Sequence, residues 1–205
     1  MKHLRIFISQ KAFTVVELLV VIFLLVLLTS MAIFYSSSAE DQVNVFREEG
    51  RVLTAIYTAR DLAIETYGKG GVSDVPCAYG IQVGPTQTNG TTIAVFAYKP
   101  DVSGQCENIF TNTNGPDPAN MTTVNQVTLE AGYVSSNFSS LFFVPPDPRV
   151  CVSHNVGTYS CNENAFASFL PCLFVRGARG SSDSIPISIN RFGQITTNDA
   201  SCQQN

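Results

Sequence analysis

The sequence predicts an α+β fold in which a long N-terminal helix packs on an antiparallel β-sheet head, and three observations predict it. An apolar run of 23 residues covers positions 13–35. The segment that follows it, up to Tyr67, repeats its apolar residues at helical spacing. From Val72 onward, short runs rich in Thr, Val, Ile, Phe and Tyr alternate with Gly, Pro, Asn and Ser, a pattern typical of strands and turns. Helix first and strands afterwards indicate an α+β fold.

Composition and charge exclude several classes of protein. Hydrophobic residues make up 45% of the 205 residues and charged residues only 14%, which excludes intrinsic disorder and a solvated coiled coil. Twelve Lys and Arg against 16 Asp and Glu give a net charge of −4, so no overall positive field favours nucleic acid as the main partner. With two His residues and neither a nucleophile motif nor a phosphate loop, the chain is not expected to be an enzyme or to need a cofactor.

The apolar run from Phe13 to Tyr35 is long enough to cross a membrane. Its 23 residues would form a helix of roughly 34 Å, and the hydrocarbon core of a bilayer is about 30 Å thick. The preceding segment 1–12 has three basic residues and no acid, so the positive-inside rule leaves it in the cytoplasm and the rest of the chain outside. The run contains one charge, Glu17, and a carboxylate in a membrane helix is costly unless it has a partner and a function.

Two simpler interpretations of this run are a secretory signal peptide and a plain single-pass anchor of a surface protein. The run is longer than the apolar region of a signal peptide, and Ser36–Ala39 is a poor cleavage site. A plain anchor leaves Glu17 unexplained.

The junction from Lys11 to Val21, with the sequence KAFTVVELLVV, resembles the class III signal of type IV prepilins and type II secretion pseudopilins. In that family a short basic leader ends in Gly and precedes Phe-Thr-Leu-Ile-Glu-Leu, whereas this sequence has Ala12 at the Gly position. The resemblance implies cleavage by a prepilin peptidase between Ala12 and Phe13, and N-methylation of Phe13. It also implies that Glu17 pairs with the N-terminal amine of a neighbouring subunit during assembly.

The resemblance further implies a type IV pilin fold and a structural role as a major pilin, a minor pilin or a pseudopilin. Such a subunit enters the cytoplasmic (inner) membrane with its head outside and then joins an extracellular filament. The implied partners are other pilin subunits, the peptidase, a membrane assembly platform and membrane lipid. The expected domains are a leader (1–12), a transmembrane assembly helix (13–35), an amphipathic helix of the head (36–67) and a β-rich head (68–205).

Within the head, an inward helix face and seven strands are expected. Val43, Phe46, Leu53, Ile56 and Ala63 are predicted to point inward, and charged residues that include Glu48 and Glu49 are predicted to form the polar face. Residues 36–38 could cap or kink one helix, or separate two helices. Strands are expected near 78–83, 92–99, 124–129, 141–144, 172–176, 185–189 and 194–196, in one antiparallel sheet, with loops at 102–120 and 145–165. The segments 51–64 and 187–195 also resemble the helix and the closing hairpin of H-type minor pseudopilins.

Six cysteines, an even number, predict disulfides formed outside the cytoplasm. Fifteen pairings are possible, and the simplest one joins Cys77 to Cys106, Cys151 to Cys161, and Cys172 to Cys202. A zinc site around Cys151 and His154 is the competing interpretation. The chain has no Cys-x-x-Cys motif, and an oxidising compartment favours disulfides over zinc.

Three arginines in the last third, Arg176, Arg179 and Arg191, form a candidate anion or DNA contact. Gly177 and Gly180 would give a ligand access to the backbone there. The corresponding alternative function is a minor pilin that binds DNA for uptake. Because acidic residues outnumber basic ones, any such contact is expected to be weak and sensitive to salt.

Overall fold

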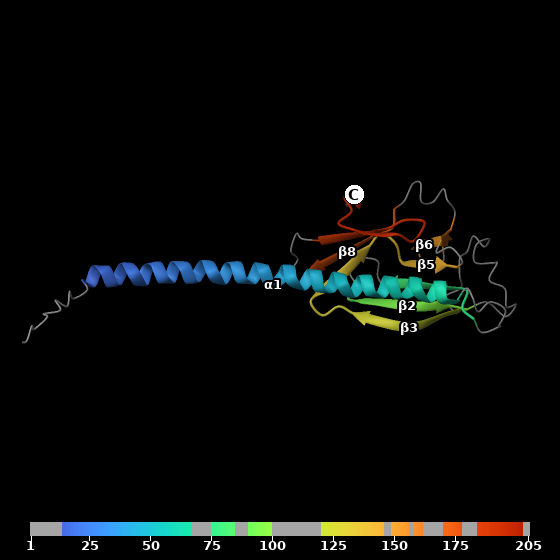
Figure 1. The fold of residues 1–205 in the computed structure, drawn as a ribbon, viewed down its shortest axis with the longest axis horizontal. Helices are drawn as coiled ribbons and strands as arrows, with labels where there is room; N and C mark the ends of the chain where they lie inside the picture. Colours follow the sequence, from blue (N-terminus) through green and yellow to red (C-terminus); the bar gives the residue numbers. More distant parts are fainter. Residues whose placement is uncertain are drawn as a thin grey trace, which may run out of the picture. The chain divides into compact units, whose positions relative to one another are not determined.

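The computed structural model describes residues 14–66, 75–84, 90–99, 120–145, 149–155, 158–161, 170–177 and 184–202. This part of the chain contains one helix, α1 (Val15–Thr66), followed by ten strands (Figure 1). The chain divides into two compact units, Met1–Glu40 and Asp41–Asn205. The predicted α+β fold, with a long N-terminal helix followed by an antiparallel β head, is confirmed.

Helix α1 is one element of 52 residues and runs unbroken through positions 36–38, so the alternative of two separate helices is wrong. Tyr67, the expected last residue of the helix, lies outside the described residues.

The strands form two antiparallel sheets, so the prediction of a single sheet is wrong. The first sheet has the order β3-β2-β1-β5-β6-β7, and the second has the order β10-β9-β8-β4. The first contains β1 (Ala78–Val83), β2 (Thr92–Tyr98), β3 (Met121–Thr128), β5 (Ser140–Val144), β6 (Arg149–Asn155) and β7 (Thr158–Ser160). The second contains β4 (Gly132–Ser136), β8 (Cys172–Gly177), β9 (Ser184–Ile189) and β10 (Ile195–Thr197). Gly90 and Val134 exchange backbone hydrogen bonds of 2.9 and 2.8 Å, which tie the start of β2 to the second sheet.

Three of these strands were not predicted from the sequence. They are β4, β6 and β7, of which β6 and β7 fall inside the predicted loop 145–165. Strand β6 pairs with β5 over five residues, and its Val150 and Val152 are buried. His154, expected in a surface loop, lies in β6.

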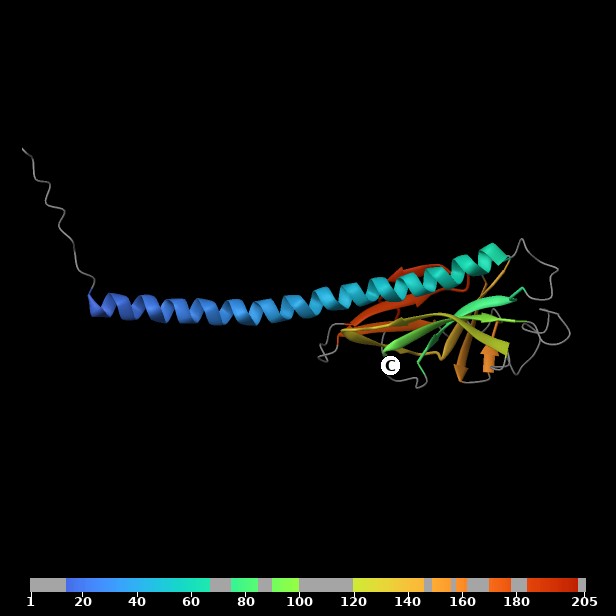
Figure 2. The ribbon, with the colours of Figure 1, turned by 90° about the horizontal axis from the view of Figure 1, so that it is seen from below.

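One apolar core joins the head part of α1 to both sheets, and Figure 2 shows residues 41–66 of the helix lying along one side of the strands. The helix contributes Ile56 and three alanines, Ala55, Ala59 and Ala63, each almost fully buried. Because alanine side chains are short, the helix backbone can approach the strands closely. The helix also contributes Val52, and most of the remaining core residues alternate along β1, β2, β5, β6, β8 and β9. Val134 of β4, Leu129 and Phe138 complete this core.

The inward face of the helix differs from the predicted one. Ile56 and Ala63 are buried and Leu53 is partly buried, as predicted. Val43 and Phe46, also predicted to point inward, are 65% and 62% exposed. Glu48 was assigned to the polar face, but it is buried.

Each sheet has a second, smaller apolar cluster on its other face. On the first sheet, Phe96 and Phe142 meet edge-to-face, with ring centroids 4.8 Å apart, and Cys151 belongs to the same cluster. On the second sheet the cluster is Cys172, Phe174 and Cys202. Cysteines therefore take part in both small clusters.

Candidate functional site

The first candidate site is the beginning of α1. Ala12 and Phe13, the predicted cleavage and methylation positions, lie outside the described residues, which start at Thr14. Thr14 precedes the helix, and its Oγ1 accepts a hydrogen bond of 3.3 Å from the backbone N–H of Glu17. Its carbonyl accepts a bond of 3.2 Å from the N–H of Leu18. The sequence Thr-Val-Val-Glu thus has the spacing of a capping box, with Thr14 as the N-cap.

Glu17 lies in the first turn of α1, and its side chain is exposed. A negative charge near a helix N-terminus is favoured by the partial positive charge of the unpaired N–H groups. The local structure therefore explains why an acid fits this position. It does not explain a charge in an apolar segment, because Gln completes a capping box as well.

The apolar part of α1 is exposed in the part of the chain that the structure describes. The span Val15–Ile33 has a mean hydropathy of 2.8, and none of it is buried. The polar hydroxyls near its end are satisfied inside the helix. Thr29 Oγ1 donates to the carbonyl of Leu25 at 2.8 Å, and Ser30 Oγ donates to that of Val26 at 2.7 Å. A helix that is apolar on all sides and satisfies its own polar groups suits lipid or a bundle of similar helices.

The second candidate site is a carboxylate clamp inside the head, made by Glu48. Its side chain is only 1% exposed. Oε1 accepts hydrogen bonds from the backbone N–H groups of Glu130 and Ala131, at 3.3 and 3.2 Å. The clamp thus fastens the turn between β3 and β4 to the helix.

Arg51 links the same turn from the outside. Its Nη1 lies 3.6 Å from Glu48 Oε2, too long for a hydrogen bond but close enough for charge attraction, and its Nη2 lies 3.1 Å from Glu130 Oε1. Arg51 also donates to the carbonyl of Thr128 at 3.4 Å. The neighbouring Glu49 has no such partners among the described residues, and burial raises its pKa above the ordinary value.

Sequence reasoning missed the clamp although a signal was present. Val45, Glu48, Val52 and Ala55 follow one another at spacings of three, four and three residues. Glu48 therefore occupies a position on the buried stripe of the helix, and an acid there requires polar partners.

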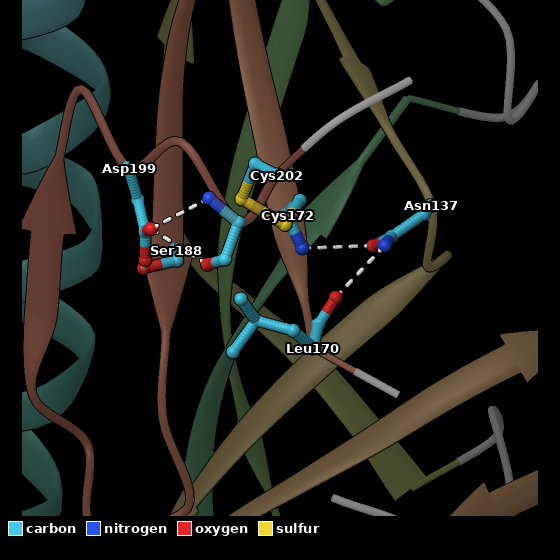
Figure 3. The surroundings of a disulfide bond; sticks show 7 residues. Asn137, Leu170, Cys172, Ser188, Asp199 and Cys202 are labelled. Carbon is cyan, nitrogen blue, oxygen red and sulfur yellow. Dashed lines mark hydrogen bonds between the residues drawn. A yellow bond between two sulfur atoms is a disulfide. The ribbon is translucent and has the colours of Figure 1, made fainter. Parts of the chain in front are cut away.

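The third feature is the disulfide Cys172–Cys202, which joins the start of β8 to the chain beyond β10 (Figure 3). Asn137 holds the strand start, since its Oδ1 accepts from Cys172 N–H and its Nδ2 donates to the Leu170 carbonyl, both at 2.8 Å. Asp199 holds the other end by accepting bonds from the hydroxyls of Ser188 and Ser201. These hydrogen bonds lower the pKa of Asp199 below its ordinary value.

Cys77, Cys151 and Cys161 are disulfide-bonded as well. Cys151 and Cys161 form a disulfide, as in the simplest pairing from the sequence. Cys77 is also disulfide-bonded. Its predicted partner, Cys106, lies outside the described residues, so this pair stays a prediction.

Two of the three candidate arginines, Arg176 and Arg191, lie toward opposite ends of strand β9. Arg176 pairs with Ser184 at one end of the β8–β9 hairpin, whereas Arg191 follows the other end of β9. Strand β9, the six residues from Ser184 to Ile189, lies between the two arginines and spans roughly 17 Å. Arg179 lies outside the described residues. Arg176 and Arg191 thus lie apart, and the contact that includes Arg179 stays a prediction.

Comparisons with known proteins give one structural similarity. No protein-family model matches the sequence, and no curated protein matches it significantly. A search of solved structures finds the type IV minor pilin FimU of Pseudomonas aeruginosa, with 13% sequence identity and a TM-score of 0.40. The match covers 78% of this chain and 94% of that chain.

Proposed function

We propose that this chain is a type IV pilin-like subunit that is cleaved after Ala12 and assembles into a filament. The observation that carries the proposal is the prepilin-like junction KAFTVVE, followed directly by the apolar helix Val15–Ile33, none of which is buried by the described residues. Lipid would cover that surface before assembly, and other subunits would cover it afterwards. The role is structural rather than enzymatic.

Glu17 would be the assembly residue. Its backbone position in the capping box accounts for a polar side chain, but only a cationic partner offsets the cost of a charge inside an apolar bundle. Cleavage before Phe13 creates such a cation, the new α-amino group. Four residues separate Phe13 from Glu17, about 6 Å along a helix, so a small axial shift would place the amine of one subunit beside the carboxylate of the next.

The disulfides support a head outside the cytoplasm. Cys151–Cys161 and Cys172–Cys202 are formed, and bonds of this kind persist in oxidising compartments. With a cytoplasmic leader and an external head, the helix would cross the cytoplasmic membrane, from which the filament would grow outward.

N-terminal sequencing of the mature protein from cells tests the cleavage. We expect it to begin at Phe13 with a methylated amine. Ala12→Gly should be cleaved at least as fast, because Gly is the smaller residue, whereas Ala12→Leu should accumulate as precursor. A mature protein that keeps Met1, or that begins beyond Ser36, would refute the proposal.

Three variants separate the charge of Glu17 from its capping role. Glu17→Gln keeps the capping box and removes the charge, and Glu17→Val removes both. Thr14→Val removes the cap and keeps the charge. If the charge drives assembly, both Glu17 variants should be depleted from sheared filaments while Thr14→Val is incorporated. Normal incorporation of Glu17→Gln would mean that capping, rather than pairing with the amine, is the function of this residue.

A further inference from the structure

The head has an outward helix face that its own sheets leave uncovered. The exposed residues of this part of the helix are Gln42, Val43, Phe46, Arg47, Gly50, Thr54, Tyr57, Asp61, Ile64 and Glu65. Four of them, Val43, Phe46, Tyr57 and Ile64, are large apolar residues that are 43–65% exposed. The outward face of a helix in a water-soluble domain is normally charged. This face instead has the composition of a surface that another protein covers.

The second feature is the tip of the β9–β10 hairpin, residues 190–194. Phe192 is 58% exposed there, and the guanidinium carbon of Arg191 lies 4.4 Å from the centroid of its ring. This is a cation–π contact. Aromatic residues and arginine are enriched among the residues that dominate binding energy at protein interfaces.

The hairpin tip is held in one conformation by its own hydrogen bonds. The side-chain oxygen of Asn190 accepts from the backbone N–H groups of Phe192 and Gln194, both at 3.0 Å. Gly193 adopts φ 70°, a conformation that favours glycine. The N–H of Val150 donates to the carbonyl of Arg191 at 3.1 Å and anchors the tip to β6. A rigid tip loses little conformational entropy when it binds.

We propose that the hairpin tip of one head docks on the outward helix face of a second copy, with Phe192 against Tyr57 and Arg191 paired with Asp61. Tyr57 and Asp61 are four residues apart on one face, and such neighbours lie about 6 Å from each other. The stacked Arg191 and Phe192, 4.4 Å apart, present a cation and a ring at a similar spacing. The inference rests on the proposed function, because it names a contact between subunits of the same filament.

Charge favours this docking. Between Asp41 and Asn205 the chain has 14 acidic and nine basic residues, so two heads repel each other unless a cation of one meets an acid of the other. Asp61 makes no ion pair with any residue that the structure describes. A guanidinium has five N–H donors, so Arg191 can bond Asp61 in addition to its contacts within its own chain.

The symmetry of the contact also suits a filament. The hairpin tip and the outward helix face are different surfaces of one molecule, so the contact runs head-to-tail. Contacts of that type repeat along an open helical array when their rotation does not close a ring.

Photo-crosslinking in the full-length protein tests the docking. A benzoylphenylalanine at position 192 should form crosslinks to peptides covering residues 52–69 of a second copy. Co-expression of copies with two different tags distinguishes links between copies from links within one. Crosslinks to another segment, to the same copy or to another protein would overturn the proposal.

Charge reversal provides the matched test. Arg191→Glu and Asp61→Arg should each reduce the crosslink and the filament yield roughly five- to tenfold, and the double variant should restore both. Arg149→Glu, which reverses another exposed cation of the head, is the control and should have little effect. Because all three side chains are exposed, unchanged thermal unfolding should confirm that the variants are folded. A double variant that stays as weak as the single ones would overturn the pairing.

The two proposals fail in different ways. If the wild-type protein enters no filament, the proposed function is wrong, and the proposed contact between subunits is wrong as well. If the wild-type protein assembles, and Arg191→Glu and Asp61→Arg assemble equally well, only the docking is wrong.

Discussion

Glu48 and Glu49 are adjacent acids for which the structure predicts opposite effects on stability. Glu48→Ala removes the acceptor of two backbone N–H groups in the β3–β4 turn. A hydrogen bond to a charged group contributes about 1.5–3 kcal/mol, and the N–H groups that lose it are partly buried. Taking the lower value for each of two long bonds gives a loss of about 3 kcal/mol. For a domain of this size that corresponds to a fall in Tm of roughly 6–12 °C.

Two further variants provide comparisons for the loss of stability expected from Glu48→Ala. Glu48→Gln keeps an acceptor for the turn but loses the attraction to Arg51, so it should cost about 1 kcal/mol. Glu49→Ala should leave stability unchanged or slightly raised, because burial raises the pKa of Glu49 and so disfavours its ionised form in the folded head. Glu49 therefore favours folding only at low pH, and this contribution is lost as the pH rises through its raised pKa.

Thermal unfolding of the full-length protein in detergent measures these differences. The chain has no Trp, so the near-ultraviolet circular dichroism of its tyrosines is a suitable signal for the head. Equal Tm values for Glu48→Ala and Glu49→Ala would show that the clamp contributes nothing. A Glu48→Gln variant as unstable as Glu48→Ala would show that charge, rather than the two hydrogen bonds, is what the turn requires.

Three other perturbations test separate parts of the head. Replacing Cys172 and Cys202 by Ala opens a bridge with a sequence separation of 30 residues, which should cost about 3–4 kcal/mol in thermal unfolding. Because the pKa of Asp199 is lowered in the folded chain, its carboxylate stabilises the wild-type protein at a pH above the ordinary pKa of Asp. This stabilisation is lost as the pH falls through the lowered pKa. Asp199→Asn should therefore abolish a loss of stability that the wild-type protein shows below about pH 4. Gly80→Ala should destabilise the first sheet by roughly 1–3 kcal/mol, since a Cβ there would lie 2.6 Å from the ring of Phe96. A wild-type Tm for the cysteine or Gly80 variant would refute the predicted effect of that variant. An Asp199→Asn variant with the same loss of stability at low pH as the wild-type protein would refute the role of Asp199.

The sequence predicted best those elements whose pattern is local. Strand β1 was expected at 78–83 and has these bounds, and β2 ends one residue earlier than expected. Both strands consist mainly of apolar and β-branched residues, and described turn residues such as Gly84 and Gly90 follow or precede them. The apolar helix was equally clear, because length and hydropathy alone define it.

Prediction from the sequence failed where contacts with neighbouring elements decide the local structure. Strand β4 has a single large aliphatic residue, Val134, and it becomes a strand because β8 pairs with it. Strand β6 follows a proline-rich stretch that indicated a loop. On the helix, the spacing of Val43 and Phe46 suggested burial, yet both are exposed, whereas Val52, Ile56 and three alanines are buried. The site residues were predicted by family resemblance, whereas the Glu48 clamp depends on a turn 82 residues away.

If the chain is the proposed filament subunit, its exposed apolar helix has a consequence for the energetics of filament growth. Lipid tails are as apolar as leucine, so moving Val15–Ile33 from the bilayer into a bundle of similar helices gains little from the hydrophobic effect. The free energy that retains a subunit must then come from a few specific contacts, such as a charge pair at Glu17 and those between heads. A transfer so nearly balanced can run in either direction. The membrane would therefore act as a reservoir that supplies subunits to a growing filament and takes them back when it shortens.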